Sequence, residues 1–198
     1  MKAFRQTGFT LLELMVAIFV AAIVLGLGVP SFQNFVQNGR MTAAANDMLA
    51  AVHIARSEAV KRRTNVTMCP SANPQAVPPV CGGAIANGWI VFVDRNGDTI
   101  VNPNAAPALD DTVLLTHDAM PANWNALADG NYVQFAMTGF VRTAPIGPPV
   151  STVVMCDIRG NVNIGGGTSA GRLMTIGVTG RPQILRTVAD VTGAGGCP

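Results

Sequence analysis

Glu13 is the residue whose type and position most directly suggest chemistry, because it is the one acid in an apolar run from Phe9 to Val29. This run of 21 residues can cross a bilayer as a helix, which requires about 20 residues. A carboxylate inside such a helix is costly and therefore indicates a functional position. Because pairing offsets much of the cost of an isolated charge in a low-dielectric setting, we expect Glu13 to act through a cationic partner.

The apolar run is expected to enter a membrane in spite of its acid. Its thirteen Phe, Leu, Ile and Val residues contribute about −4 to −8 kcal/mol, whereas a central acid costs about +3 kcal/mol and Glu13 lies near one end. Lys2 and Arg5 precede the run with no acid beside them, so the basic end should stay cytoplasmic. A secretory signal peptide cut near Gly26-Leu27-Gly28 is the alternative, but the length and the internal acid favour an anchor.

The start of this run resembles the class III signal of type IV pilins and type II secretion pseudopilins. The matching segment is Gly8-Phe9-Thr10-Leu11-Leu12-Glu13-Leu14. In that family a prepilin peptidase cuts after the glycine and methylates the new N-terminus, and the glutamate guides assembly. The resemblance therefore implies cleavage between Gly8 and Phe9, N-methylation of Phe9, and an assembly role for Glu13 through the amine of a neighbouring subunit.

Composition predicts a membrane anchor followed by one modest domain. Gly and Pro together make 34 of the 198 residues and lie mostly beyond residue 64, which favours a loop-rich β domain. We expect a leader at 1–8, a transmembrane helix at 9–29, an amphipathic helix at 30–63 and a β-rich head at 64–198. From residue 64 onward there are six Arg, no Lys and eight Asp, so the head is not a bulk nucleic-acid binder.

The helix is expected to continue past the membrane, with a kink at Pro30. One apolar face recurs at spacings of four and three residues, which is typical of an amphipathic helix. Its members are Met41, Ala45, Met48, Val52, Ala55 and Ala59. The basic run Lys61-Arg62-Arg63 then lies at the negative end of the helix dipole, where cations are favourable.

The remainder predicts short strands separated by turns. Segments rich in β-formers are Val66–Cys69, Trp89–Asp94, Thr112–His117, Tyr132–Phe135, Thr152–Asp157, Leu173–Val178 and Gln183–Val188. Irregular loops are expected at Ser71–Pro79 and Asn102–Pro107.

Several segments of the chain are similar to the GspH/FimT branch of the pilin family. These are Ala55-Arg56-Ser57-Glu58-Ala59, Gly88-Trp89-Ile90-Val91-Phe92-Val93-Asp94, Met155-Cys156-Asp157-Ile158-Arg159-Gly160 and Thr179-Gly180-Arg181-Pro182. The resemblance implies an α+β fold, in which a long N-terminal helix packs on a sandwich-like head of antiparallel sheets.

Four cysteines lie on the side of the chain expected outside the membrane, which favours two disulfides over free thiols. They are Cys69, Cys81, Cys156 and Cys197, and three pairings are possible. Cys69–Cys81 is the favoured local pair and would leave Cys156–Cys197. A zinc site is disfavoured because no Cys-x-x-Cys spacing occurs.

The segment from Asp94 to Asp98 has oxygen ligands at alternate positions, as a calcium loop does. Thr99 and Ala105, however, stand where an EF-hand requires Gly and Glu, so a tight hairpin turn at Asn96-Gly97 is favoured. We therefore expect no metal ion and no cofactor.

Arg181 is a candidate DNA contact, because FimT-like minor pilins use a Gly-Arg-x-Arg stretch near the C-terminus. Here the stretch is Gly180-Arg181-Pro182-Gln183, so the second arginine is missing and only Arg186 could substitute. No nucleophile motif accompanies His53 or His117, and an enzyme is not expected.

The sequence therefore predicts a minor pilin or pseudopilin, a structural subunit of a type IV pilus or of a type II secretion pseudopilus. A DNA-binding minor pilin for natural transformation is the alternative. The expected partners are other pilins, the prepilin peptidase and an inner-membrane assembly platform. The expected location is the bacterial inner membrane, crossed once, with the head in the periplasm before assembly.

Overall fold

A computed structural model describes residues 8–103, 110–144 and 147–197. The expected leader residues 1–7 and part of the expected loop at Asn102–Pro107 lie outside these ranges. The chain divides into two compact units, Met1–Arg40 and Met41–Pro198. Helix α1 (Leu11–Arg62) contributes to both units and carries Pro30 inside it. Its N-terminal part is long and apolar enough to cross a membrane, and the most hydrophobic window is wholly exposed.

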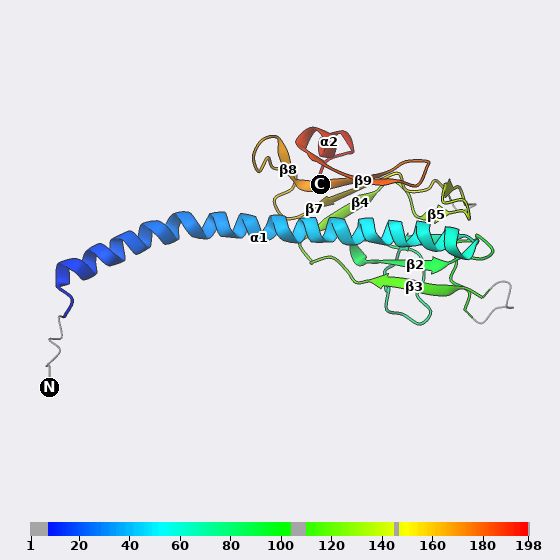
Figure 1. Ribbon diagram of the computed structural model, residues 1–198, viewed down its shortest axis with the longest axis horizontal. Coiled ribbons are helices and arrows are strands. Elements are labelled where there is room, and N and C mark those ends of the chain that lie inside the picture. Colours follow the sequence, from blue (N-terminus) through cyan, green and yellow to red (C-terminus); the bar gives the residue numbers. More distant parts are fainter. Residues whose placement is uncertain (1–7, 104–109, 145–146, 198) are drawn as a thin grey trace. The chain divides into compact units, whose positions relative to one another are not determined.

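The second unit contains two antiparallel sheets (Figure 1). The five-stranded sheet has the order β3-β2-β1-β5-β6, and the four-stranded sheet has the order β4-β7-β8-β9. The bounds are β1 Val66–Pro70, β2 Trp89–Val93, β3 Thr112–His117, β4 Asn125–Ala128, β5 Val133–Phe135, β6 Val141–Arg142, β7 Thr152–Cys156, β8 Thr168–Ile176 and β9 Pro182–Thr187. A 3-10 helix, η1 (Ile85–Asn87), and a short helix, α2 (Val188–Gly193), complete the described elements.

The main core lies between the C-terminal half of α1 and both sheets, as Figure 1 shows for the cyan part of the helix. All six residues of the predicted apolar face are buried, and Ala51 joins them. Small alanines on this face let the helix approach the sheets closely, while Met41 and Met48 fill the remaining space. The predicted apolar face is thus buried, and the α+β fold is confirmed.

Four elements differ from the expectation. Strand β4 and the two-residue strand β6 lie where no strand was predicted, because β4 holds two alanines and β6 is too short to show alternation. Strand β8 begins at Thr168, five residues before the predicted start. Helix α2 was also missed, although the Thr187 side chain accepts a hydrogen bond from the Asp190 backbone N–H and so caps it.

The Asn96-Gly97 prediction of a tight hairpin turn is wrong. Strands β2 and β3 are antiparallel neighbours, but residues 94–111 connect them. The backbone instead wraps around the buried Asp94 carboxylate, which accepts hydrogen bonds from the N–H groups of Gly97, Asp98 and Thr99 at 2.7, 3.1 and 3.0 Å. Of the alternating oxygen-bearing residues, Asp94 therefore stabilises the loop by accepting hydrogen bonds from the loop backbone.

Two disulfides cross-link the head. Cys69–Cys81 spans 12 residues with its Cα atoms 5.5 Å apart, and Cys156–Cys197 spans 41 residues with its Cα atoms 5.8 Å apart. The first bond closes the Pro-rich segment that follows β1. The second ties the segment after α2 to strand β7. On the neighbouring strand β8, Gly171 has no side chain and so leaves room for the Cys197 sulfur.

Loss of the longer cross-link is expected to cost more stability. In the chain-entropy treatment, Cys156→Ser/Cys197→Ser should lose about 4 kcal/mol and Cys69→Ser/Cys81→Ser about 3 kcal/mol. Urea unfolding of the detergent-solubilised full chain measures both, with peptide mapping under non-reducing conditions as the control. A wild-type protein with four alkylatable thiols would contradict the pairing.

Candidate processing and assembly site

Gly8 and Phe9, the two residues of the predicted cleavage site, lie before helix α1 and have no regular secondary structure. A Cβ atom added at Gly8 would meet no atom within 4 Å, and Phe9 is 78% exposed. Within the described residues, Phe9 is therefore accessible and no other part of the chain crowds the Gly8 backbone.

Thr10 caps the helix that follows. Its hydroxyl oxygen accepts a hydrogen bond from the Glu13 backbone N–H at 3.2 Å, and its carbonyl accepts one from the Leu14 N–H at 3.1 Å. The spacing Thr10-x-x-Glu13 is that of a capping box, which gives the start of this helix a local signature in the sequence. The residue types of the processing motif thus also set the point at which the helix begins.

Glu13 lies in the first turn of α1 and is exposed. The helix N-terminus carries a partial positive charge, so an acid at this position is electrostatically favourable. Glu13 forms no ion pair with any residue in the described ranges. Because Phe9 precedes the helix, the two residues are not held one helical turn apart here. The expected pairing of a free Phe9 amine with Glu13 therefore stays a prediction.

Of the two arginines considered for DNA, Arg181 immediately precedes strand β9 and Arg186 lies within it. Arg181 is exposed between the turn that ends at Gly180 and Pro182, where a Cβ on Gly180 would lie 2.7 Å from the Gly139 carbonyl oxygen. Arg186 is exposed five residues further on. At about 3.3 Å per residue, and with side chains alternating between faces, the pair does not reproduce adjacent Gly-Arg-x-Arg contacts.

The two histidines have different surroundings. His53 is exposed on α1, whereas the His117 ring stacks on buried Trp89 with centroids 3.7 Å apart. The His117 Nε2 atom lies 3.8 Å from the Asp47 carboxylate, which links strand β3 to the helix. In the part of the chain that the structure describes, no group of three His, Cys, Asp or Glu could hold a metal ion.

Comparisons with known proteins agree with this geometry. The chain matches the family model described as "Type II transport protein GspH" over residues 44–180, and the prokaryotic N-terminal methylation motif over residues 3–29. It is 40% identical over 65 residues to the prepilin peptidase-dependent protein D of Escherichia coli (strain K12). This alignment covers 33% of this chain and 37% of that protein.

One solved structure shows the same fold. The crystal structure of the type IV minor pilin FimU of Pseudomonas aeruginosa (strain PAO1) aligns with a TM-score of 0.50 and 19% identity. The alignment covers 76% of this chain and 92% of that chain.

Proposed function

The chain belongs to the GspH family of type II transport proteins, and we propose that it is a minor pilin or pseudopilin, a structural subunit built into a membrane-assembled filament. The observation that carries this proposal is the methylation motif at the start of an exposed apolar helix. That helix continues into a disulfide-bonded head of antiparallel sheets.

The leader, the apolar helix and the head suggest the order of insertion, folding and cleavage. The basic leader holds the N-terminus in the cytoplasm, α1 crosses the inner membrane, and the head folds in the periplasm, where its disulfides form. A prepilin peptidase then cuts between Gly8 and Phe9 and methylates Phe9. Other pilins or pseudopilins and an inner-membrane assembly platform are the proposed partners.

Glu13 is proposed to couple insertion to docking. In the membrane the Glu13 carboxylate of one subunit attracts the N-terminal amine on Phe9 of the next subunit. Pairing of the two groups offsets the free-energy cost of burying both charges. The head contributes structure and no catalytic step to this process. The DNA-binding alternative is not supported, because neither the matched family nor the placement of Arg181 and Arg186 favours it.

Cleavage is tested by intact mass. When the chain is expressed with its peptidase and extracted from membranes, the mass should correspond to residues 9–198 with one added methyl group and two disulfides. Cells that lack the peptidase provide the control and should retain residues 1–8. A mature N-terminus near Val29 would instead identify an ordinary signal peptide and contradict the proposed function.

A further inference from the structure

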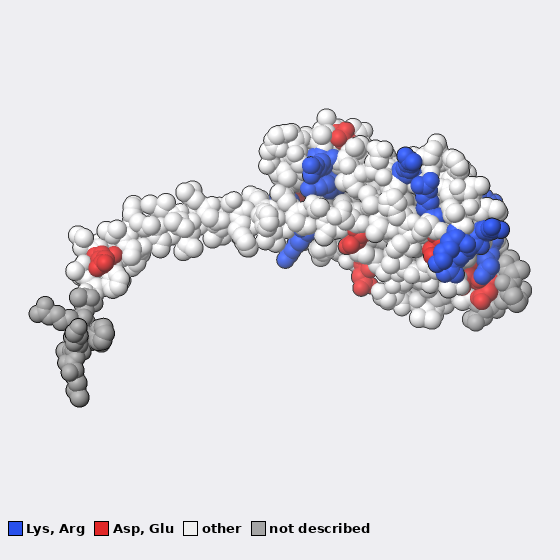
Figure 2. Space-filling model, in the orientation of Figure 1, with Lys and Arg blue, Asp and Glu red and all other residues white. Residues whose placement is uncertain are grey.

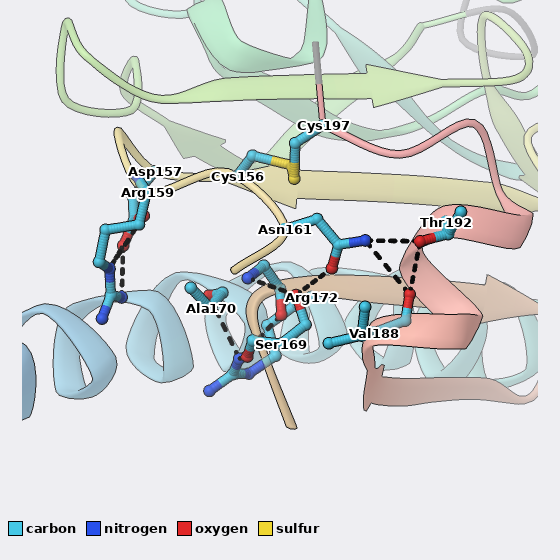
Figure 3. Close-up of a disulfide and its surroundings, with 11 residues drawn as sticks. Cys156, Asp157, Arg159, Asn161, Ser169, Ala170, Arg172, Val188, Thr192 and Cys197 are labelled. Atoms are coloured by element: carbon cyan, nitrogen blue, oxygen red, sulfur yellow. Dashed lines mark hydrogen bonds and ion pairs between the residues drawn. A yellow bond between two sulfur atoms is a disulfide. The ribbon is translucent and has the colours of Figure 1, made fainter. Parts of the chain in front are cut away.

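The head carries an arginine cluster, Arg159, Arg172 and Arg186. Leu173 on β8 pairs with Leu185 on the antiparallel strand β9, so Arg186 lies across from Arg172, and both Arg186 and Arg159 are near enough to act on the Arg172 charge. Arg172 is only 5% exposed, yet no carboxylate within the described residues bonds to it. Its Nη1 donates to the carbonyl oxygens of Ser169, Ala170 and Gly171 at 2.8, 3.3 and 2.8 Å (Figure 3). Carbonyl dipoles stabilise this cation but do not neutralise it.

The surroundings of Arg172 add positive charge. Burial lowers the pKa of its guanidinium, and Arg186 and Arg159 lower the pKa further, while Asp157 opposes them. Asp157 is already paired with Arg159, through a contact of 3.0 Å between Arg159 Nε and Asp157 Oδ2. Asp190 on α2 accepts from the Thr187 hydroxyl at 2.6 Å. The cluster therefore has a net excess of cations.

This excess is local. The unit from residue 41 onward has ten Lys and Arg and ten Asp and Glu, so it is neutral as a whole. Figure 2 shows the Lys and Arg side chains of its visible face gathered in separate groups. An anionic partner that is attracted to this unit must therefore recognise a cluster.

The chain limits how far this cluster can lie from the proposed membrane span. Arg172 Nη2 lies 3.4 Å from the Thr42 hydroxyl, and Thr42 follows Phe35 by seven residues within α1. Phe32 and Phe35 are 68% and 74% exposed, and Phe is one of the residues that amphipathic helices bury at the membrane–water interface. Seven residues reach at most about 25 Å even when fully extended, so headgroups at the end of the proposed span stay within reach of the head.

We infer that the exposed Arg186, reinforced by the buried charge of Arg172, binds the phosphate of an anionic phospholipid headgroup and holds the head against the outer face of the membrane before assembly. A guanidinium matches phosphate oxygens in bidentate geometry. The tether keeps headgroups within reach at all times, whereas a neighbouring subunit's acid arrives only at assembly. The inference rests on the proposed membrane anchoring.

The test uses the full chain, one copy per lipid nanodisc, and measures amide hydrogen exchange of residues 157–193. Discs of phosphatidylcholine are compared with discs that also contain phosphatidylglycerol, and with phosphatidylcholine discs in added inorganic phosphate. We expect slower exchange with phosphatidylglycerol alone. Each arginine near an anionic surface contributes a factor of about five, so Arg186→Gln should lower the docking equilibrium about fivefold.

Arg142→Gln is the matched control, because it removes the same charge from an exposed position on β6 in the other sheet. It should leave the protection unchanged. Equal exchange in both lipids, or equal losses in both variants, would overturn the inference. So would protection by inorganic phosphate, which indicates a free-anion site, or protection only in discs with two copies, which indicates a neighbour's acid. A chain that does not stay in discs would refute the membrane anchoring itself.

Discussion

Glu13→Leu is expected to leave membrane insertion intact and to reduce incorporation into filaments at least tenfold. The substitution replaces an unfavourable insertion term with a favourable one, so the anchor should enter the bilayer as well as before. It also removes the proposed partner of the incoming amine, and an unpaired buried charge costs about 3 kcal/mol or more, equivalent to a factor of about a hundred. Fractionation of sheared filaments against membranes measures the two effects separately.

Glu13→Gln is the matched variant for this experiment, because it keeps the size and the hydrogen-bonding capacity while it removes the charge. Both variants should accumulate in the membrane fraction if charge pairing directs assembly. If Gln restores incorporation and Leu does not, a hydrogen bond rather than an ion pair joins the subunits. Equal incorporation of wild type and both variants would show that the acid does not direct assembly in this protein.

Asp94→Ala is expected to destabilise the head by about 3 kcal/mol or more. Besides three backbone N–H groups, the carboxylate accepts from the Thr67 hydroxyl and the Gln134 amide, each at 2.8 Å. These donors come from strands β1 and β5 and from the loop after β2, so one buried side chain joins three neighbouring parts of a sheet. Each buried donor left without a partner costs about 1–3 kcal/mol.

Urea unfolding of the full chain in detergent measures this loss. Asp118→Ala is the control, because Asp118 is exposed and accepts one side-chain hydrogen bond, from Gln75 at 2.7 Å. Its effect should stay below about 1 kcal/mol. An Asp94 variant as stable as the Asp118 variant would mean that water replaces the carboxylate and that the network does not fix the loop.

The sequence predicted those features that a periodic pattern or a local motif controls. The apolar face of α1 follows from spacing alone, and the strands that were predicted are dense in β-branched residues. Strand β4 and the first half of β8 were not predictable in this way, because their alanines and glycines are selected by close contacts with neighbouring strands. Gly171, for example, lies where a Cβ atom would come 3.1 Å from the Met155 carbonyl oxygen.

The candidate site shows the same division. The motif residues Gly8, Phe9 and Glu13 could be named from type and spacing, and Thr10 could have been, since its capping-box spacing is local. The environment of Arg172 could not be predicted from the sequence. Its hydrogen-bond partners are carbonyl groups of a bulged strand and Thr42, a helix residue 130 positions away. A tertiary arrangement of that kind has no signature along the chain.

The short outer strands of the two sheets matter when many heads are crowded together. Of the four outer strands in the described sheets, β6 has two residues, β4 has four and β9 opens with Pro182, which has no N–H; β3, with six residues and no proline, is the exception. Exposed sheet edges are the usual templates for runaway strand pairing between chains, and short or proline-bearing edges resist it. Heads packed side by side can thus touch at the β4, β6 and β9 edges through side chains while their sheets stay separate, which leaves β3 as the one long edge without proline in the described sheets.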